Sequence, residues 1–242
     1  MARIFITGSS DGLGQLAAKK LVDMGHRVVL HGRNEDRGKD ALNQVPGAEK
    51  VLSADLSKME EIKRLAKEVN ESGHFDAIIH NAGINQGSGD LIFTVNTLAP
   101  YILTCLIRKP GRLIYLSSGS HLSGDSNLDK MYNGRISYSD SKMHKLILAK
   151  AVARKWPDVF SNAVDPGWVP TKMGGPGAPG SLQKGIETQV WLAVGEDAEV
   201  SGRYFHHKKE ARYREEADKA GLQDQFIRNC EEITGVPFPV DE

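Results

Sequence analysis

A tyrosine and a lysine four residues apart, Tyr138 and Lys142, have the types and the spacing for acid–base chemistry. The run 138–155 has the apolar spacing of a helix, so both side chains should lie on one face of it. A phenol with an ordinary pKa of about 10 exchanges protons poorly at neutral pH, but a nearby ammonium stabilises the phenolate and lowers that pKa. The alternative interpretation is a surface pair on an ordinary helix.

A glycine-rich segment follows the first strand-like run, 3–7. It carries Gly8, Gly12 and Gly14, which allow a sharp turn and a close approach of the backbone to a pyrophosphate at the next helix N-terminus. The spacing is G-x-x-x-G-x-G rather than G-x-G-x-x-G, and a structural loop could have the same composition. Its position after the first strand of a βαβ unit favours dinucleotide binding.

These residues are carried by short β-branched runs that alternate with longer amphipathic ones. Strands are predicted at 3–7, 27–31, 50–54, 75–80, 112–117, 159–164 and 203–206. Helices are predicted at 13–24, 35–45, 57–71, 91–106, 138–155 and 182–194. Ser57 with Glu60 predicts a capping box at the start of the third helix, and Pro100 predicts a kink in the fourth.

This alternation predicts a single α/β domain, 1–242, with a C-terminal helical segment at about 208–242. We expect a Rossmann-type doubly wound sheet of about seven parallel strands with helices on both faces. In such sheets the ligand crevice lies outside the carboxyl ends of the strands, where the strand order reverses. Ser117 and Ser118 end the fifth predicted strand and should face that crevice.

Composition narrows the class of protein. The 242 residues include 31 basic and 31 acidic side chains, and no basic stripe of the kind that nucleic acids require stands out. No apolar stretch is expected to reach the roughly 18 residues of a membrane span, and a strand from Arg3 leaves no room for a signal peptide. Cys105 and Cys230 make no disulfide framework, and no Cys/His spacing indicates a metal. We expect a soluble cytoplasmic protein.

Taken in order, these segments resemble the motifs of the short-chain dehydrogenase/reductase family, classical branch. T-G-x-x-x-G-x-G is 7–14, N-A-G is 81–83, Y-x-x-x-K is 138–142 and P-G-x-x-x-T is 166–171. The family's helix asparagine is similar to Asn96, and its fifth-strand serine is similar to Ser118, with Ser117 as the alternative register. The resemblance runs from Arg3 to about Phe205.

The resemblance implies hydride transfer between a nicotinamide cofactor and a small-molecule carbonyl/alcohol pair, with Asn96, Ser118, Tyr138 and Lys142 as catalytic residues. Tyr138 would protonate the carbonyl oxygen and act as the base in the reverse direction. Lys142 would lower the pKa of Tyr138 and hold the nicotinamide ribose. Ser118 would hydrogen-bond the substrate oxygen, and Asn96 would hold a water that links Lys142 to solvent.

The resemblance also implies a cofactor site. Asp55 would meet the adenine, Asn81 would help to hold the sheet and the cofactor, and Thr171 would bind the nicotinamide carboxamide. The full set implied to bind the cofactor is Gly8, Ser10, Gly12, Leu13, Gly14, Arg33, Asp55, Leu56, Asn81, Ala82, Gly83, Tyr138, Lys142, Pro166, Gly167 and Thr171.

The choice of cofactor depends on the end of the second strand. An acidic residue there accepts the adenosine ribose hydroxyls of NAD and repels a 2′-phosphate. The sequence has Gly32-Arg33-Asn34 instead, and the Arg33 guanidinium suits a phosphate. Against this, Asp11 stands in the glycine-rich turn where many NADP-preferring relatives carry a basic residue. We expect NADP(H) to be favoured, with NAD(H) possible.

Several alternatives stay open. A C=C reductase of the same fold and a non-catalytic dinucleotide-binding redox sensor compete with the carbonyl/alcohol enzyme. The segment between Asn96 and Ser118 is shorter than usual in the family, which favours a dimer over a tetramer if the chain forms a homo-oligomer. The longer stretch before Tyr138 favours retinol-dehydrogenase-like members. The Gly- and Pro-rich segment within 173–184 is either a lid or an inert loop.

The histidines are given conservative interpretations. His206 and His207 are expected at a solvated strand end rather than on a metal. His144 is expected on the flank of its helix, and His121 either lines the substrate pocket or packs beside it.

Overall fold

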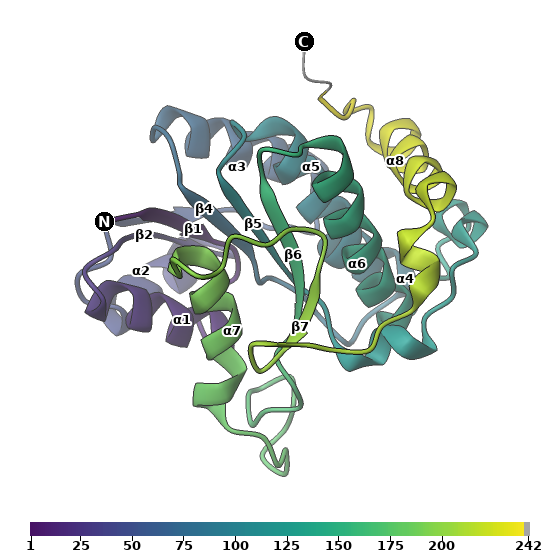
Figure 1. Ribbon diagram of the computed structural model, residues 1–242. Helices are drawn as coiled ribbons and strands as arrows, with labels where there is room; N and C mark the ends of the chain where they lie inside the picture. Colours follow the sequence, from purple (N-terminus) through teal and green to yellow (C-terminus); the bar gives the residue numbers. More distant parts are fainter. Residues whose placement is uncertain (240–242) are drawn as a thin grey trace.

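The computed structural model describes residues 1–239, and the strands of this part form one eight-stranded sheet in the order β3-β2-β1-β4-β5-β6-β7-β8 (Figure 1). They are β1 Arg3–Ile6, β2 Arg27–Gly32, β3 Lys50–Ser53, β4 Ala77–His80, β5 Arg112–Leu116, β6 Phe160–Asp165, β7 Tyr204–His206 and β8 Lys209–Glu210. Strands β1 to β7 pair in parallel, which confirms the predicted sheet, and β8 adds an antiparallel edge.

Helices cover both faces of the sheet (Figure 1). One face carries α1 Gly12–Asp23, α2 Glu35–Gln44 and α7 Leu182–Val194; the other carries α3 Met59–Glu71, α4 Gly89–Phe93, α5 Ala99–Leu106 and α6 Tyr138–Lys155. α8 Ala220–Thr234 packs against α6. Ile4 and Ile6 join one buried cluster and Phe5 the other, as the period-two alternation of a strand buried on both faces requires. The single domain over 1–242 stays a prediction, and 240–242 lie outside the described residues.

The helix predicted at 91–106 is built in three parts. α4 continues into a π-helical turn, Thr94–Leu98, and then into α5, with Pro100 in the first turn of α5. The interruption expected at Pro100 therefore lies just before it. Single π-helical turns inside α-helices are frequent at functional sites, and this one carries Asn96.

The segment Gly89–Leu106 is also long and apolar enough to cross a membrane. It has 18 residues with a mean hydropathy of 1.3, so the expectation that no stretch reaches this length is wrong. In the fold, 72% of it is buried, as in a core helix of a globular domain.

The capping box predicted at Ser57 and Glu60 is wrong, because α3 begins only at Met59. Ser57 instead turns back to Asp55. Its backbone N–H and its Oγ donate to Asp55 Oδ1 at 3.0 and 2.7 Å. Ser57 therefore holds the carboxylate of Asp55 in place just after β3.

Candidate active site

A cleft of about 1010 Å³ opens at the carboxyl ends of the parallel strands, on the side where the strand order reverses between β1 and β4. The segments after β1, β4, β5 and β6 line it, together with the first two turns of α6. Of the residues that the sequence assigns to the site, all line this cleft except Gly14 and Asn96, which lie behind its wall.

The glycine-rich turn and the N-A-G segment form one hydrogen-bonded unit. Asn81 Nδ2 donates to the carbonyl oxygens of Thr7 and Gly8 at 3.0 and 2.9 Å. A Cβ on Gly8 would lie 2.9 Å from Cα of Ala82, and a Cβ on Gly14 would lie 2.4 Å from Asn81 Nδ2. Neither position has room for a side chain. Gly14 therefore contributes to the site by leaving space for the Asn81 carboxamide that bonds the glycine-rich turn.

The cradle beside this turn fits a dinucleotide. Gly12, with φ +57, faces the cleft, where the nearest atoms to an added Cβ belong to the Thr171 side chain, at 3.8 Å and beyond. The helix α1 begins at this glycine, so its free N–H groups point at the same space. These features fit the pyrophosphate that the resemblance implies.

His31 holds the glycine-rich turn from the other side, a role that the sequence analysis missed. Its buried Nδ1 accepts the Gly8 N–H at 2.9 Å, and Nε2 lies 3.0 Å from the carbonyl oxygen of Ala54. Accepting from Gly8 requires a bare Nδ1, so the imidazole is neutral, with its proton on Nε2. Burial lowers the pKa of His31 to about 4. The sequence signal for this role is a histidine near the end of β2, the strand that pairs with β1 beside the glycine-rich turn.

Two ion pairs stand at the end of β2, where the adenosine end of a dinucleotide is expected. Arg33 donates through Nε and Nη2 to Asp55 Oδ2 at 3.1 and 3.0 Å, and 71% of its side chain is exposed. Arg37, from α2, pairs with Asp11 at 2.5 Å and lies 3.4 Å from Ser10 Oγ. The sequence analysis missed Arg37, which neutralises the acid that argued against NADP.

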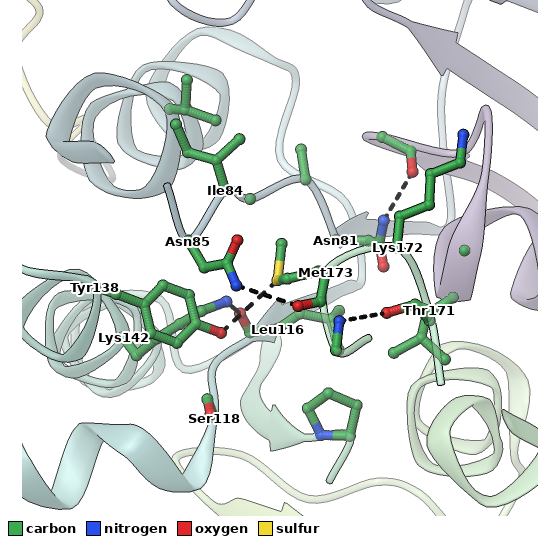
Figure 2. A pocket seen from close by; sticks show the side chains of 18 of the residues that line it. Asn81, Ile84, Asn85, Leu116, Ser118, Tyr138, Lys142, Thr171, Lys172 and Met173 are labelled. Atoms are coloured by element: carbon green, nitrogen blue, oxygen red, sulfur yellow. Dashed lines mark hydrogen bonds between the residues drawn. The ribbon is translucent and has the colours of Figure 1, made fainter. Parts of the chain in front are cut away.

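Tyr138 and Lys142 occupy successive turns of α6, as predicted. A capping box between Ser137 and Asp140 fixes the first turn of this helix. Lys142 Nζ lies 5.2 Å from the centre of the Tyr138 ring and donates to the carbonyl oxygen of Leu116 at 2.9 Å. The tyrosine ring and the buried ammonium therefore lie together at the end of β5 (Figure 2).

The pKa values of this pair differ from the expectation. Burial raises the pKa of Tyr138, a hydrogen bond with Ser118 offsets part of the rise, and the Asp165 carboxylate adds to it. Burial lowers the pKa of Lys142 to about 8, and Asp165 opposes this change. The predicted lowering of the Tyr138 pKa is wrong for this structure, because burial is the largest effect on the phenol and the Lys142 ammonium is bonded to the Leu116 carbonyl instead.

Of the two serines after β5, Ser118 is the one that contacts Tyr138. Its Oγ accepts the Ser120 N–H at 3.2 Å and so caps a short 3₁₀ helix. Ser117 Oγ donates to the main-chain oxygen of Lys142 at 2.8 Å and is buried. Ser118 Oγ also donates to Ser120 Oγ, at 3.2 Å, but Ser118 is partly exposed in the cleft whereas Ser117 is buried, which favours Ser118 as the substrate contact.

Asn96 lies outside the cleft and connects two of the segments that form its wall. Its Oδ1 accepts the Ile84 N–H at 2.8 Å, and its Nδ2 donates to the Ile84 carbonyl at 2.8 Å and to Ser141 Oγ at 3.0 Å. These contacts occupy the carboxamide and join the chain after N-A-G to α6. Lys145, which the sequence analysis missed, makes a similar link, since its buried ammonium donates to the Ala82 carbonyl at 2.8 Å.

The chain after β6 crosses the open side of the cleft. Lys172 Nζ lies 3.1 Å from Asp11 Oδ2 on one wall, and Asn85 Nδ2 donates to the Met173 carbonyl at 3.2 Å on the other. Figure 2 shows Met173 turned toward Tyr138, whose Oη lies 4.0 Å from the sulfur. These contacts hold the start of the segment across the cleft, and the choice between a lid and an inert loop stays a prediction.

The Thr171 hydroxyl lines the cleft and accepts the Gly174 N–H at 3.2 Å, so it also orders this segment. His144, expected on the flank of its helix, is buried there and bonded to Thr97 at 3.1 Å. His121 is buried behind Ser118. Among residues 1–239, no group of three or more His, Cys, Asp or Glu side chains could hold a metal ion.

Comparison with known proteins shows the family of this chain and supports its fold. A family model described as short chain dehydrogenase matches residues 2–179. The chain is 45% identical to an uncharacterized oxidoreductase of Emericella nidulans, with 99% of both chains covered, and 41% identical to the short-chain dehydrogenase chyC of Penicillium rubens, with 99% and 100% covered. A solved structure from Mycobacterium paratuberculosis has a TM-score of 0.84 at 22% identity, with 99% and 96% covered. Human retinol dehydrogenase 14, at 28% identity over 96% of this chain and 85% of its own, is a more distant relative than the fungal proteins.

Proposed function

Because the chain belongs to the short-chain dehydrogenase family, whose members are NAD(P)-dependent oxidoreductases, we propose that it interconverts a ketone or aldehyde and the corresponding alcohol with NADP(H) as the preferred cofactor. The observation that carries the proposal is the meeting of the Tyr138 and Ser118 hydroxyls with the buried ammonium of Lys142 at the end of β5. This group lies in the same cleft as the glycine cradle.

Each of these side chains has a defined task in the reaction. When bound, a nicotinamide cofactor supplies or accepts the hydride. Tyr138 Oη gives its proton to the carbonyl oxygen in the reduction and takes it back in the oxidation. Its raised pKa keeps the phenol protonated at neutral pH, which suits the reduction. Ser118 Oγ holds the same oxygen, and the Lys142 ammonium stabilises the phenolate that remains after proton transfer.

The Ser118–Tyr138 contact supports catalysis over redox sensing. A sensor needs the cradle formed by the glycine-rich turn, but it does not need a phenol aligned with a second hydroxyl at the substrate end of the cleft. A C=C reductase would use the same cradle. Product analysis separates it from a carbonyl reductase, because reduction of a C=C bond leaves the carbonyl group in the product.

The preference for NADP(H) is supported by the side chains at the end of β2. Arg33 and Arg37 place two guanidinium groups there, and Arg37 already neutralises Asp11. The exposed Arg33–Asp55 pair contributes about 0–1 kcal/mol, so Arg33 can turn to a 2′-phosphate at little cost. A Cβ on Gly32 would lie 2.8 Å from the backbone N of Gly38, so this position does not accept the carboxylate typical of NAD enzymes without a shift of α2.

The proposed function is tested by following NADPH oxidation with a panel of aldehydes, ketones, quinones and enones and by identifying the products. We expect at least one carbonyl compound to be reduced to its alcohol. Tyr138→Phe is the matched control, because it keeps the ring and removes only the proton donor. Products with a saturated C=C bond and an intact carbonyl would assign the alternative reductase activity, and tight NADPH binding without turnover of any compound would favour the sensor.

We also propose that the protein is cytoplasmic and that any homo-oligomer is a dimer. Both cysteines, Cys105 and Cys230, are free and buried, which is compatible with a reducing compartment. Light scattering on the purified protein tests the dimer, and fractionation of the source cells tests the location.

A further inference from the structure

A carboxylate and an imidazole lie side by side in the cleft, next to the reacting groups. Asp165 ends β6 and His206 ends β7, and Asp165 Oδ2 lies 3.3 Å from His206 Nδ1. Both residues line the cleft, with 18% and 38% of their side chains exposed. A Cβ on Gly119 would lie 3.2 Å from the same Oδ2, so the residue that follows Ser118 leaves room for the carboxylate.

The surrounding chain is built to hold His206 in this place. Gly167 has φ +79, and a Cβ there would lie 3.3 Å from Cε1 of the imidazole. The turn after β7 places His207 and Lys208 at φ 48 and 60, the left-handed region that residues other than glycine rarely adopt. The backbone strain of this turn is offset in part by a hydrogen bond, in which the Lys208 N–H donates to Thr188 Oγ1 on α7 at 2.8 Å.

The hydrogen-bond partners of this pair fix what it can offer. His206 Nδ1 faces two acceptors, the carboxylate at 3.3 Å and the main-chain oxygen of Asp165 at 3.2 Å, so in the neutral ring the proton is on Nδ1. Nε2 then carries a lone pair, and it has no hydrogen-bond partner among residues 1–239. Asp165 Oδ1 accepts the Gly167 N–H at 2.9 Å, which uses one of the roughly four lone-pair positions of the carboxylate.

The cleft therefore has two chemically different walls near the reacting carbonyl. Ser118, Tyr138 and Lys142 present hydrogen-bond donors, whereas Asp165 and His206 present acceptors and a negative charge. The carboxylate is close enough to the donors for its charge to act on them. It opposes the lowering of the Lys142 pKa by burial and adds to the rise of the Tyr138 pKa. A substrate that places its carbonyl oxygen on the donor wall has the acceptor wall within reach of its neighbouring atoms.

Building on the proposed function, we propose that Asp165 and His206 determine substrate specificity by accepting a hydrogen bond from a hydroxyl or N–H group adjacent to the reacting carbonyl. The substrate class is then an α-hydroxy or α-amino carbonyl compound. A carboxylate in the same place is rejected, because it lacks a donor and is repelled by Asp165.

Three aryl ketones that differ only at this position test the proposal: 2-hydroxyacetophenone has a donor, acetophenone has none, and benzoylformate has a carboxylate. We expect the wild-type kcat/KM to be about ten- to a hundredfold higher for the hydroxyketone than for acetophenone, as for a hydrogen bond to a charged group, and lowest for benzoylformate. Asp165→Asn and, independently, His206→Leu should reduce these ratios, which cancel any effect that the loss of the Asp165 charge has on Lys142 and Tyr138 with all three ketones alike. Asp158→Asn, an exposed carboxylate before β6 that pairs with Lys109, is the matched control and should change none of them.

The dissociation constant of NADPH, measured by fluorescence, provides the second readout. It should stay unchanged in Asp165→Asn. If this variant instead binds NADPH more weakly and slows all three ketones equally, the carboxylate serves the cofactor and the proposal is overturned. Equal wild-type kcat/KM values for the three ketones would overturn it while leaving the proposed function intact. If no carbonyl compound of the wider panel were reduced, the proposed function would fail and this inference with it.

Discussion

The ammonium of Lys142 is held on the carbonyl oxygen of Leu116, at 2.9 Å, with the centre of the Tyr138 ring 5.2 Å away. This anchor belongs to the end of β5 and not to the tyrosine, so the position of the ammonium does not depend on the phenol. The two residues can therefore be changed one at a time, with separate consequences for proton transfer and for charge.

Tyr138→Phe should lower kcat for carbonyl reduction by about 10²- to 10⁴-fold, because it removes the proton donor. The affinity for NADPH should stay nearly unchanged, since the ring and the Lys142 anchor remain. Steady-state kinetics and NADPH fluorescence measure the two quantities. Tyr132→Phe, at an exposed tyrosine outside the cleft, is the matched control. Retention of more than half of the activity by Tyr138→Phe would contradict the assignment.

The rate of reduction should fall at alkaline pH because Lys142 loses its charge. The ammonium form dominates below the pKa of about 8 and disappears above it. We expect kcat/KM for a carbonyl substrate to be constant near pH 7 and to fall above pH 8. In Lys142→Arg, whose guanidinium stays charged, this fall should vanish even if the rate is lower. Lys142→Met should weaken NADPH binding and lower the rate together. A wild-type profile that is flat up to pH 10 would argue against this role.

The sequence predicts the elements and most residues of the cleft, because the signals that specify them are local. Alternation of apolar runs gives the strands, and glycines and prolines mark their ends, where the site residues lie. Ser118 could be placed in the crevice from topology, since parallel strands share their carboxyl edge, whereas the role of Tyr138 came from the resemblance of 138–142 to Y-x-x-x-K.

The hydrogen bonds that connect the segments around the cleft could not be predicted, because they join residues that are distant in sequence. His31 reaches Gly8, and Asn96 reaches Ile84 and Ser141, only after the sheet and α6 have packed. Local patterns even mislead here: Ser57 has capping-box spacing, yet its hydroxyl binds Asp55. The π-helical turn around Asn96 has no sequence signal of its own.

Arg33→Ala should raise the KM for NADPH by about tenfold or more and leave that for NADH unchanged, because a charged hydrogen bond to the 2′-phosphate is lost. Introducing an acid at Gly32 is a poor test, since its Cβ would collide with the backbone of Gly38. Arg27→Ala, at the opposite end of β2, is the matched control. Equal kcat/KM of the wild type with NADH and NADPH would exclude the phosphate contact.

If the segment after β6 acts as a lid, Lys172→Ala should speed the release of NADPH, because it removes the ion pair with Asp11 that holds this segment across the cleft. The pair is largely exposed, so the increase should stay below about fivefold and should vanish at high salt. Stopped-flow fluorescence measures the release rate. Lys184→Ala, at an exposed lysine in the first turn of α7 that does not line the cleft, is the control. An unchanged rate of NADPH release at low salt would show that the Lys172–Asp11 ion pair does not hold this segment closed over the cofactor.

Three of the four buried histidines, those whose pKa is lowered to about 3 or 4, should make the fold sensitive to mild acid. Burial lowers the pKa of His31 and His144 to about 4 and that of His80 to about 3. The unfolded chain, with histidine pKa values of about 6.5, binds more protons between these limits. Stability is therefore fully present above about pH 6.5 and is lost as the pH falls toward 4.

From pH 6 to pH 5, each of these histidines should lower the free energy of unfolding by about 1 kcal/mol, or about 3 kcal/mol together, as measured by urea unfolding. Between pH 7 and pH 8 they should contribute almost nothing, which provides the internal control. His80→Phe keeps the stack on Tyr115 and removes one titrating group, so it should remove about 1 kcal/mol, one third of what these three histidines contribute to the acid slope. The Thr104 hydroxyl that contacts His80 retains bonds to Pro100 and Tyr115. An unchanged slope in His80→Phe would show that this imidazole is not held neutral by burial.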